Sequence, residues 1–110
     1  MVIVTSWRAY ELLYAPVVKG HLRVLELKYH SLIRDTIELR LKHHPEIETT
    51  NRKPLKRPVF FGATWELRIG PNNRFRVFYK VDRSNHRVAI LAIGEKQGQR
   101  LILGREEVQL

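Results

Sequence analysis

The chain has 110 residues and a mass of 13.0 kDa, which suits a single domain over residues 1–110 with one apolar core. An apolar fraction of 44% with 28% charged residues excludes a disordered chain. The sequence has no cysteine, which excludes disulfides, thiolate metal sites and cysteine nucleophiles. Its 20 Lys and Arg against 11 Asp and Glu give a net charge of +9 and favour a polyanionic partner.

The sequence predicts neither a membrane segment nor a secretory signal. No run approaches the roughly 18 consecutive apolar residues of a membrane span. Residues 1–8 lack the basic start and long apolar centre of a signal peptide. We therefore expect a cytoplasmic protein. Its positive charge is uneven, because residues 52–105 contain 13 basic and 3 acidic side chains, whereas residues 1–51 contain 7 and 6.

The first half of the chain predicts one strand and a helical hairpin. Residues 10–14 are short, aromatic and apolar, as in a strand, and Pro16 suits the first turn of a helix. Between residues 22 and 41 apolar residues recur at steps of three and four, which indicates one helical stripe. That stretch exceeds an average helix, so we expect a break near residues 28–31 with Ser31 as a cap. The helix should end before Pro45.

The second half predicts a meander of strands. Residues 47–62 contain two prolines and four cations and indicate an irregular loop. Apolar and polar residues alternate over 64–69 and 74–81, on either side of a turn at 70–73, which predicts a hairpin. After a turn at 82–85, residues 87–93 are apolar on both faces, as in an interior strand that Gly94 ends. Residues 96–103 indicate a short strand or an extended arm.

The order of these elements predicts an α+β fold. An N-terminal strand and a helical hairpin precede an antiparallel β-meander, and the helices pack on one sheet face. Matching the apolar residues of the hairpin pairs Leu67 with Val77 and puts Arg68 opposite Arg76. Opposed like charges are unfavourable unless an anion lies between them. A bound phosphate would relieve this repulsion, and Glu66, diagonal to Arg76, is the internal alternative.

Further cations lie near the arginine pair. Lys80 shares its face, as does Phe78, and cations mixed with an aromatic ring are typical of surfaces that hold phosphates and stack bases. The preceding loop supplies Arg52, Lys53, Lys56 and Arg57. Together these residues favour an RNA or DNA phosphate site. The five histidines do not form a metal-ligand pattern, so we expect no metal and no cofactor.

Four blocks of the sequence resemble the RelE/ParE toxins of bacterial toxin–antitoxin pairs. They are residues 10–16, residues 53–56, the hairpin blocks 65–70 with 75–82, and residues 88–96. The resemblance implies the α+β fold of that family and a cognate antitoxin as partner. For the RelE branch it implies a ribosome-dependent endonuclease that cuts mRNA without a metal. For the ParE branch it implies an inhibitor that binds DNA gyrase.

The resemblance also implies roles for individual residues. Lys53 and Lys56 match the family's lysines before the hairpin, one of which is the candidate base, with Arg57 as a nearby substitute. Arg68 matches the arginine that stabilises the phosphate, and Lys96 lies near a later basic residue. The family's active ribonucleases place a tyrosine after the last strand. Residues 97–103 contain none, and Arg100 is their one reactive side chain. This departure favours the alternatives, a gyrase inhibitor or a catalytically inactive toxin fold.

Overall fold

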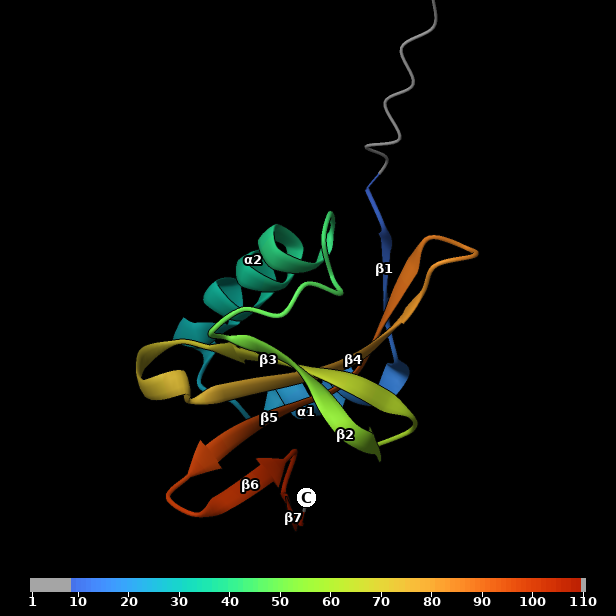
Figure 1. The fold of residues 1–110 in the computed structure, drawn as a ribbon. Helices are drawn as coiled ribbons and strands as arrows, with labels where there is room; N and C mark the ends of the chain where they lie inside the picture. The colour runs from blue at the N-terminus through green and yellow to red at the C-terminus, as the bar shows by residue number, and fades with distance from the viewer. Residues whose placement is uncertain (1–8, 110) are drawn as a thin grey trace, which may run out of the picture.

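The computed structural model describes residues 9–109, in which the expected first strand, helical hairpin and β-hairpin occur in chain order together with strands that the sequence did not predict (Figure 1). The elements are β1 (Glu11–Tyr14), α1 (Pro16–Arg23), a short 3-10 turn η1 (Leu27–Tyr29), α2 (His30–Leu41), β2 (Arg52–Val59), β3 (Ala63–Ile69), a second 3-10 turn η2 (Pro71–Asn73), β4 (Phe75–Asp82), β5 (Arg87–Gln97), β6 (Arg100–Leu103) and β7 (Glu106–Val108). None of the helices in this part of the chain is long and apolar enough to cross a membrane.

The helical hairpin is confirmed, and its corner is made differently from the prediction. Pro16 begins α1, as its fixed backbone angle favours. The break lies between the end of α1 and His30, slightly earlier than expected, and Ser31 does not cap α2. Instead, the ring Nε2 of His30 lies 2.9 Å from the carbonyl oxygen of Leu25. Leu25 is buried, so a side-chain hydrogen bond and an apolar anchor together close a corner that has no Gly or Pro.

The strands form a sheet with the order β2-β3-β4-β5-β6-β7. The predicted hairpin register is confirmed, with Leu67 opposite Val77 and Arg68 opposite Arg76. Strand β5 is interior, as expected, because β4 pairs along one edge and the opposite edge is shared. On that edge β1 runs parallel to residues 87–90, and β6 runs antiparallel to residues 94–97.

The expectation of an irregular loop over 47–62 is wrong for half of its residues, which form strand β2. The strand pairs only with β3, so it is an edge of the sheet. Pro54 and Pro58 are compatible with an edge strand because a missing backbone N–H is tolerated there. The pairing shifts register between Pro54 and Val59, where the strand is irregular. The two prolines therefore indicate an irregular edge strand and not the absence of a strand.

Gly94 does not end its strand, contrary to the prediction. Strand β5 continues to Gln97, and Gly94 lies opposite Leu103 of β6. A Cβ atom at this position would lie 2.6 Å from Cδ2 of Leu103 and 2.9 Å from the carbonyl oxygen of Ile102. Glycine is needed here because β6 approaches closely. For residues 96–103 the sequence allowed a short strand or an extended arm, and the structure has the strand, β6. The chain then turns back and pairs with β6 as β7.

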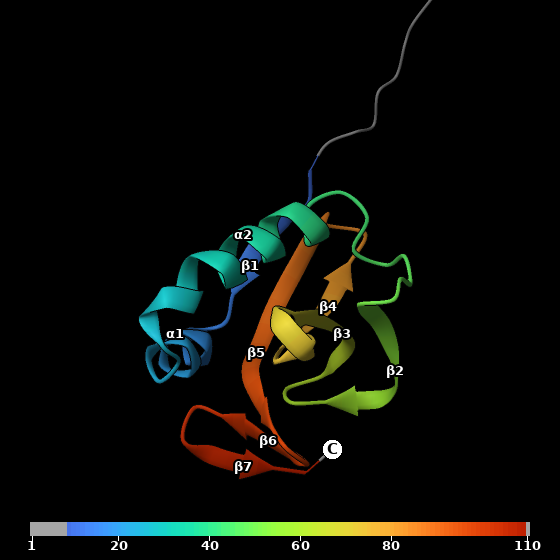
Figure 2. The same ribbon diagram turned by 90° about the vertical axis from the view of Figure 1, so that its left-hand side faces the viewer.

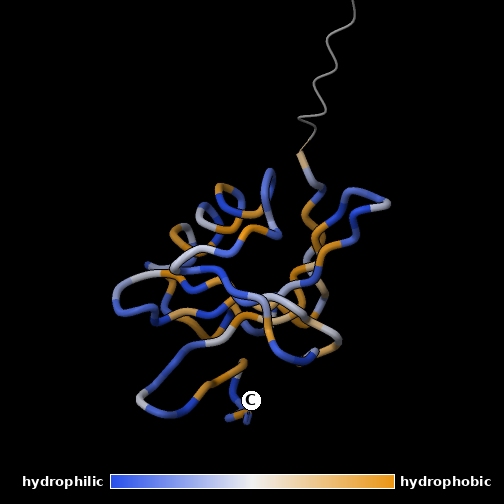
Figure 3. The backbone as a smooth tube through the Cα atoms, in the orientation of Figure 1, coloured by the Kyte–Doolittle hydropathy of each residue, from blue (hydrophilic) through white to orange (hydrophobic). Residues whose placement is uncertain are grey.

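The sheet carries apolar clusters on both faces. The first lies between the sheet and the two helices, which occupy the same side in Figure 2. The second lies on the opposite face, where the β2–β3 turn and the β6–β7 hairpin curl over it. The alternation of apolar and polar residues that feeds both clusters can be followed along the strands in Figure 3. Side chains of the first cluster include Val18, Ile33, Ile37, Leu41, Leu67, Val77, Tyr79 and Ile90; those of the second include Ala63, Phe78, Leu91, Ala92, Leu101 and Leu103.

Candidate functional site

Four of the expected site residues, one each from β2, β3, β4 and β5, lie on the same face of the sheet. Lys53 of β2 lies opposite Glu66, and Arg68, two residues along β3, lies opposite Arg76. Arg76 in turn lies opposite Gly94, two residues before Lys96. Directly paired residues, and residues two apart on one strand, point to the same side of a sheet. Lys53, Arg68, Arg76 and Lys96 therefore share the face opposite the helices.

Glu66 neutralises the arginine pair from within. Its Oε1 accepts a hydrogen bond from Nε of Arg68 at 3.1 Å, and its Oε2 accepts one from Nη1 of Arg76 at 3.2 Å. Arg76 also donates from Nε to the carbonyl oxygen of Asn73 at 3.0 Å. The side chain of Glu66 is 6% exposed and that of Arg76 is 11%, whereas that of Arg68 is 32% exposed. Glu66 thus offsets the repulsion between the two arginines without a bound phosphate, and Arg68 is the more accessible of the two guanidiniums.

Arg52 has a structural role that the sequence did not indicate. We expected it to bind phosphate, but only 6% of the residue is exposed. Its guanidinium donates from Nε to the carbonyl oxygen of Ile47 and from Nη1 to that of Arg40, both at 2.6 Å. Arg40 lies in the last turn of α2, where carbonyl groups lack helical partners and attract a cation. Arg52 therefore fastens the helix end to β2 and does not face a ligand.

Phe78 is not available to stack a base, so that expectation is also wrong. The residue is 0% exposed and lies at the centre of the second apolar cluster. Its ring meets the edge of Phe60 at 4.9 Å between ring centroids. The sequence placed it correctly on the face of the arginines, but the curled β2–β3 turn covers it. Tyr79 faces the helices as expected, and its hydroxyl donates to the carbonyl oxygen of Pro45 at 2.7 Å.

The remaining expected cations are exposed. Lys56 and Arg57 lie on β2, in the stretch where its pairing shifts, and Lys80 lies on β4. These three side chains form no ion pair with another residue among 9–109. Arg100 of β6 lies 3.4 Å from Glu107 of β7, in a pair whose side chains are 60% and 43% exposed. Such exposed pairs contribute little to stability, so Arg100 can exchange its partner for an anion.

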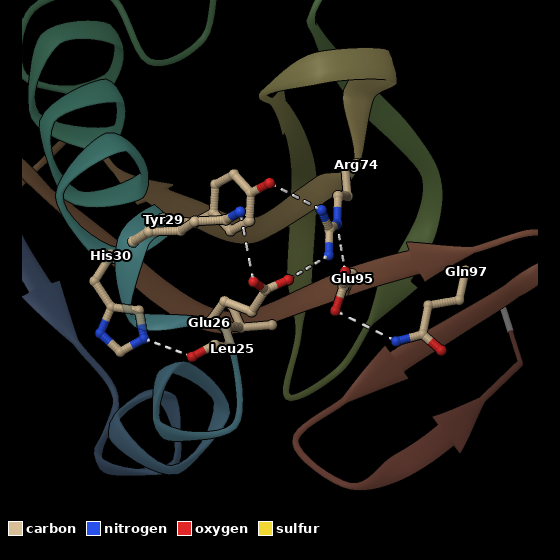
Figure 4. A network of polar contacts seen from close by, with 8 residues as sticks. Leu25, Glu26, Tyr29, His30, Arg74, Glu95 and Gln97 are labelled. Atoms are coloured by element: carbon tan, nitrogen blue, oxygen red, sulfur yellow. Dashed lines mark hydrogen bonds and ion pairs between the residues drawn. The ribbon is translucent and has the colours of Figure 1, made fainter.

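A network around Arg74 was missed by sequence reasoning. Its guanidinium donates to Glu95 at 2.5 Å, to the hydroxyl of Tyr29 at 3.1 Å and to Glu26 at 3.2 Å (Figure 4). Its backbone carbonyl accepts from the N–H of Lys96 at 2.8 Å. The network thus connects the corner of the helical hairpin with the end of β5 that carries Lys96. Arg74 is distant in sequence from residues 26 and 29 and from residue 95, so no local pattern reveals the network.

This arrangement suits the binding and polarisation of a phosphate group. Arginine presents several donors in a planar fork, and lysine adds a mobile point charge. The described face combines accessible Arg68 with Lys53 and Lys96, and exposed lysine and arginine continue along β2. Charge that develops on phosphoryl oxygens is stabilised most by donors that are already held in position. Glu66 holds the two guanidiniums in that way.

Comparison with known proteins extends the assignment of the fold. No family model and no curated protein matches the sequence. Among solved structures, the chain resembles the crystal structure of the toxin–antitoxin complex RelBE2 from Mycobacterium tuberculosis, with a TM-score of 0.62 and 20% sequence identity. The match covers 80% of this chain and 99% of that chain. The expected α+β fold of the RelE kind is thereby confirmed, and the likeness shows the fold alone.

Proposed function

We propose that this protein is the toxin of a toxin–antitoxin pair and that it cuts mRNA on the ribosome. The observation that carries the proposal is the shared face of Lys53, Arg68, Arg76 and Lys96, on a fold like that of the RelBE2 complex. The net charge of +9 favours the same partner class, a polyanion. A cognate antitoxin of opposite charge is the expected protein partner.

The proposed reaction needs only a base, an acid and positive charge near the phosphate, all of which lysine and arginine side chains can supply. The ribose 2′-oxygen attacks the neighbouring phosphorus, its proton passes to a neutral lysine, and the bond from phosphorus to the 5′-oxygen breaks. A second cationic group gives that leaving oxygen a proton. Lys53 and Lys56 are the candidate bases, and Lys96 is the candidate acid. Arg68 and Arg76 offset the negative charge on the phosphoryl oxygens.

Primer extension on an mRNA under translation in a purified system tests this proposal. We expect cuts that require both the protein and ribosomes, and no cuts on the same mRNA alone. Replacing Arg68 with Gln removes the accessible guanidinium and should lower the cutting rate by about 10²-fold. Arg34→Gln is the matched control, because it makes the same charge change on α2, in an exposed pair with Asp35.

Two results would contradict the proposal at different levels. Equal cutting by folded Arg68→Gln and the wild-type protein would show that the arginine face is not the site. Absence of cuts with the wild-type protein would contradict the endonuclease itself. Thermal unfolding of each variant shows whether a loss of activity reflects a loss of fold.

A second candidate function is inhibition of DNA gyrase by protein binding. Glu66 already pairs with both arginines, and the ring of Phe78 is buried, so the face has fewer free groups for RNA than the sequence indicated. The missing tyrosine in residues 97–103 points the same way. A supercoiling assay with purified gyrase separates the two functions. Inhibition without mRNA cutting would favour this candidate, and inhibition by neither route would indicate an inactive toxin fold.

A further inference from the structure

A cavity of about 420 Å³ lies apart from the arginine face, where three segments meet. Helix α1 forms one wall, the β2–β3 turn forms the second, and the turn between β6 and β7 forms the third. Most of the lining is apolar. The side chains that matter below are His21 of α1, Phe60 and Phe61 of the β2–β3 turn, and Arg105 and Glu106.

His21 offers this cavity a hydrogen-bond donor. The residue is 7% exposed, and its Nδ1 accepts the backbone N–H of Ile93 at 3.1 Å. Along one edge of β5, residues 87–90 pair with β1 and residues 94–97 pair with β6, and Ile93 lies between these two segments. The His21 ring therefore accepts the backbone N–H of Ile93 where a neighbouring strand would otherwise do so. An accepting Nδ1 places the proton of the neutral ring on Nε2. Within residues 9–109 Nε2 has no hydrogen-bond partner and is not sealed from solvent, and the ring that carries it lines the cavity.

The β2–β3 turn presents an aromatic ring at the rim. Phe60, Phe61 and Gly62 have φ angles of 36°, 66° and 93°. This left-handed region is unfavourable for bulky residues, and strained backbone is concentrated at functional sites. The ring of Phe60 anchors the turn on Phe78, whereas Phe61 is 71% exposed. The turn therefore keeps a strained conformation in which a large apolar ring faces solvent.

We propose that this cavity binds one base of a single-stranded nucleic acid, with Phe61 stacking on the base and Nε2–H of His21 donating to its edge. The ligand must be flat and apolar on its faces and must carry an acceptor at its edge. Burial lowers the pKa of His21 and keeps the ring uncharged, and Glu106 at the rim disfavours an anion inside. Arg105 at the rim and exposed Arg57, three residues before Phe60, suit the flanking phosphates.

The inference rests on the proposed function, because it extends the path of RNA across the sheet. Strand β3 begins next to the cavity and ends next to the arginine face. At the usual rise per residue, Phe61 and Arg68 are separated by roughly 20 Å along the chain. One strand of RNA several nucleotides long can therefore contact both, with phosphates held at Arg68 and a base held at Phe61.

Fluorescence anisotropy with two labelled hexanucleotides of equal charge tests the inference. One probe is hexauridylate, and the other is its abasic analogue, which keeps every ribose and phosphate. We expect the wild-type protein to bind hexauridylate about 5-fold to 100-fold more tightly than the abasic probe, since stacking one base on an aromatic ring gives an effect of that size. Phe61→Asn should remove most of this difference, because Asn tolerates a positive φ but cannot stack a base.

Leu39→Gln is the matched control, since Leu39 is also 71% exposed and lies on α2, away from the cavity. It should bind both probes as the wild-type protein does. Equal affinity of the wild-type protein for the two probes would overturn the base site and leave the phosphate face standing. Discrimination that survives in Phe61→Asn would also overturn it. No binding of either probe would contradict the base site together with RNA binding, and a dimer that depends on Phe61 in sedimentation would assign the cavity to a second copy of the chain.

Discussion

Glu66→Gln should weaken the fold and strengthen the binding of RNA in the same molecule. The carboxylate is 6% exposed and accepts hydrogen bonds from Arg68 and Arg76 at 3.1 and 3.2 Å. A glutamine of the same shape has one acceptor oxygen, and its amide N–H₂ would face the second guanidinium. Removal of one partner from a buried ion pair costs about 3–5 kcal/mol. Arg68 is 32% exposed and retains some hydration, so we expect a fall of about 2–4 kcal/mol in the free energy of unfolding.

The same substitution releases positive charge toward a ligand. Each cation that newly neutralises a phosphate of single-stranded nucleic acid steepens the salt dependence, plotted as log affinity against log salt, by about 0.7. Two arginines lose their internal partner, so the slope should steepen by about 0.7 to 1.4. Affinity for hexauridylate at low salt should rise accordingly. Anisotropy titrations at several salt concentrations measure both quantities, and urea unfolding followed by circular dichroism measures stability.

Glu46→Gln separates this local effect from a change in total charge. Both substitutions raise the net charge from +9 to +10. Glu46 pairs with Arg83, whose side chain is 77% exposed and already hydrated. This control should alter stability by less than about 1 kcal/mol and leave the salt slope near that of the wild-type protein. If the two variants bind RNA with the same slope, the electrostatic reasoning about Glu66 is refuted.

Four further predictions concern residues whose roles emerge from the fold. Gly94→Ala should lower the free energy of unfolding by about 1–3 kcal/mol, because the new methyl group meets Ile102 and Leu103 of β6. Gly20→Ala lies within α1, where a Cβ would have nothing within 4 Å, and should raise the free energy of unfolding by about 0.5–1 kcal/mol. Equal melting temperatures of the two glycine variants would contradict the close packing inferred at Gly94. Arg52→Met should lower the free energy of unfolding by about 2–4 kcal/mol but leave the slope of log RNA affinity against log salt concentration unchanged. A shallower slope would show that Arg52 contacts a phosphate of the ligand. Burial lowers the pKa of His21, so below about pH 6.5 the unfolded chain binds a proton that the folded one excludes. The contribution of His21 to the free energy of unfolding should be fully present above that pH and should be lost as the pH falls below it. If a His21→Asn variant loses stability equally steeply with falling pH, His21 is not the cause of the decline.

Local patterns in the sequence determined the elements whose periodicity is strong. Alternation over residues 64–81 predicted the β3–β4 hairpin and its register, including Arg68 opposite Arg76. Spacing of apolar residues by three and four predicted the helices that cover one face. These features depend on which side of a strand or helix a residue occupies, and the side-chain periods of 2.0 and 3.6 define that side without tertiary information.

Only the tertiary structure decided which of the residues on a face are accessible. Phe78 and Arg68 share one side of the sheet, but the curled β2–β3 turn buries the first and leaves the second partly exposed. Arg52 donates to the carbonyl oxygen of Arg40 in α2, twelve residues earlier, and Glu66 accepts hydrogen bonds from two guanidiniums. A local pattern specifies the direction in which a side chain points. Which other groups meet it there depends on how distant segments pack, because burial and ion pairing arise from contacts between residues far apart in the chain.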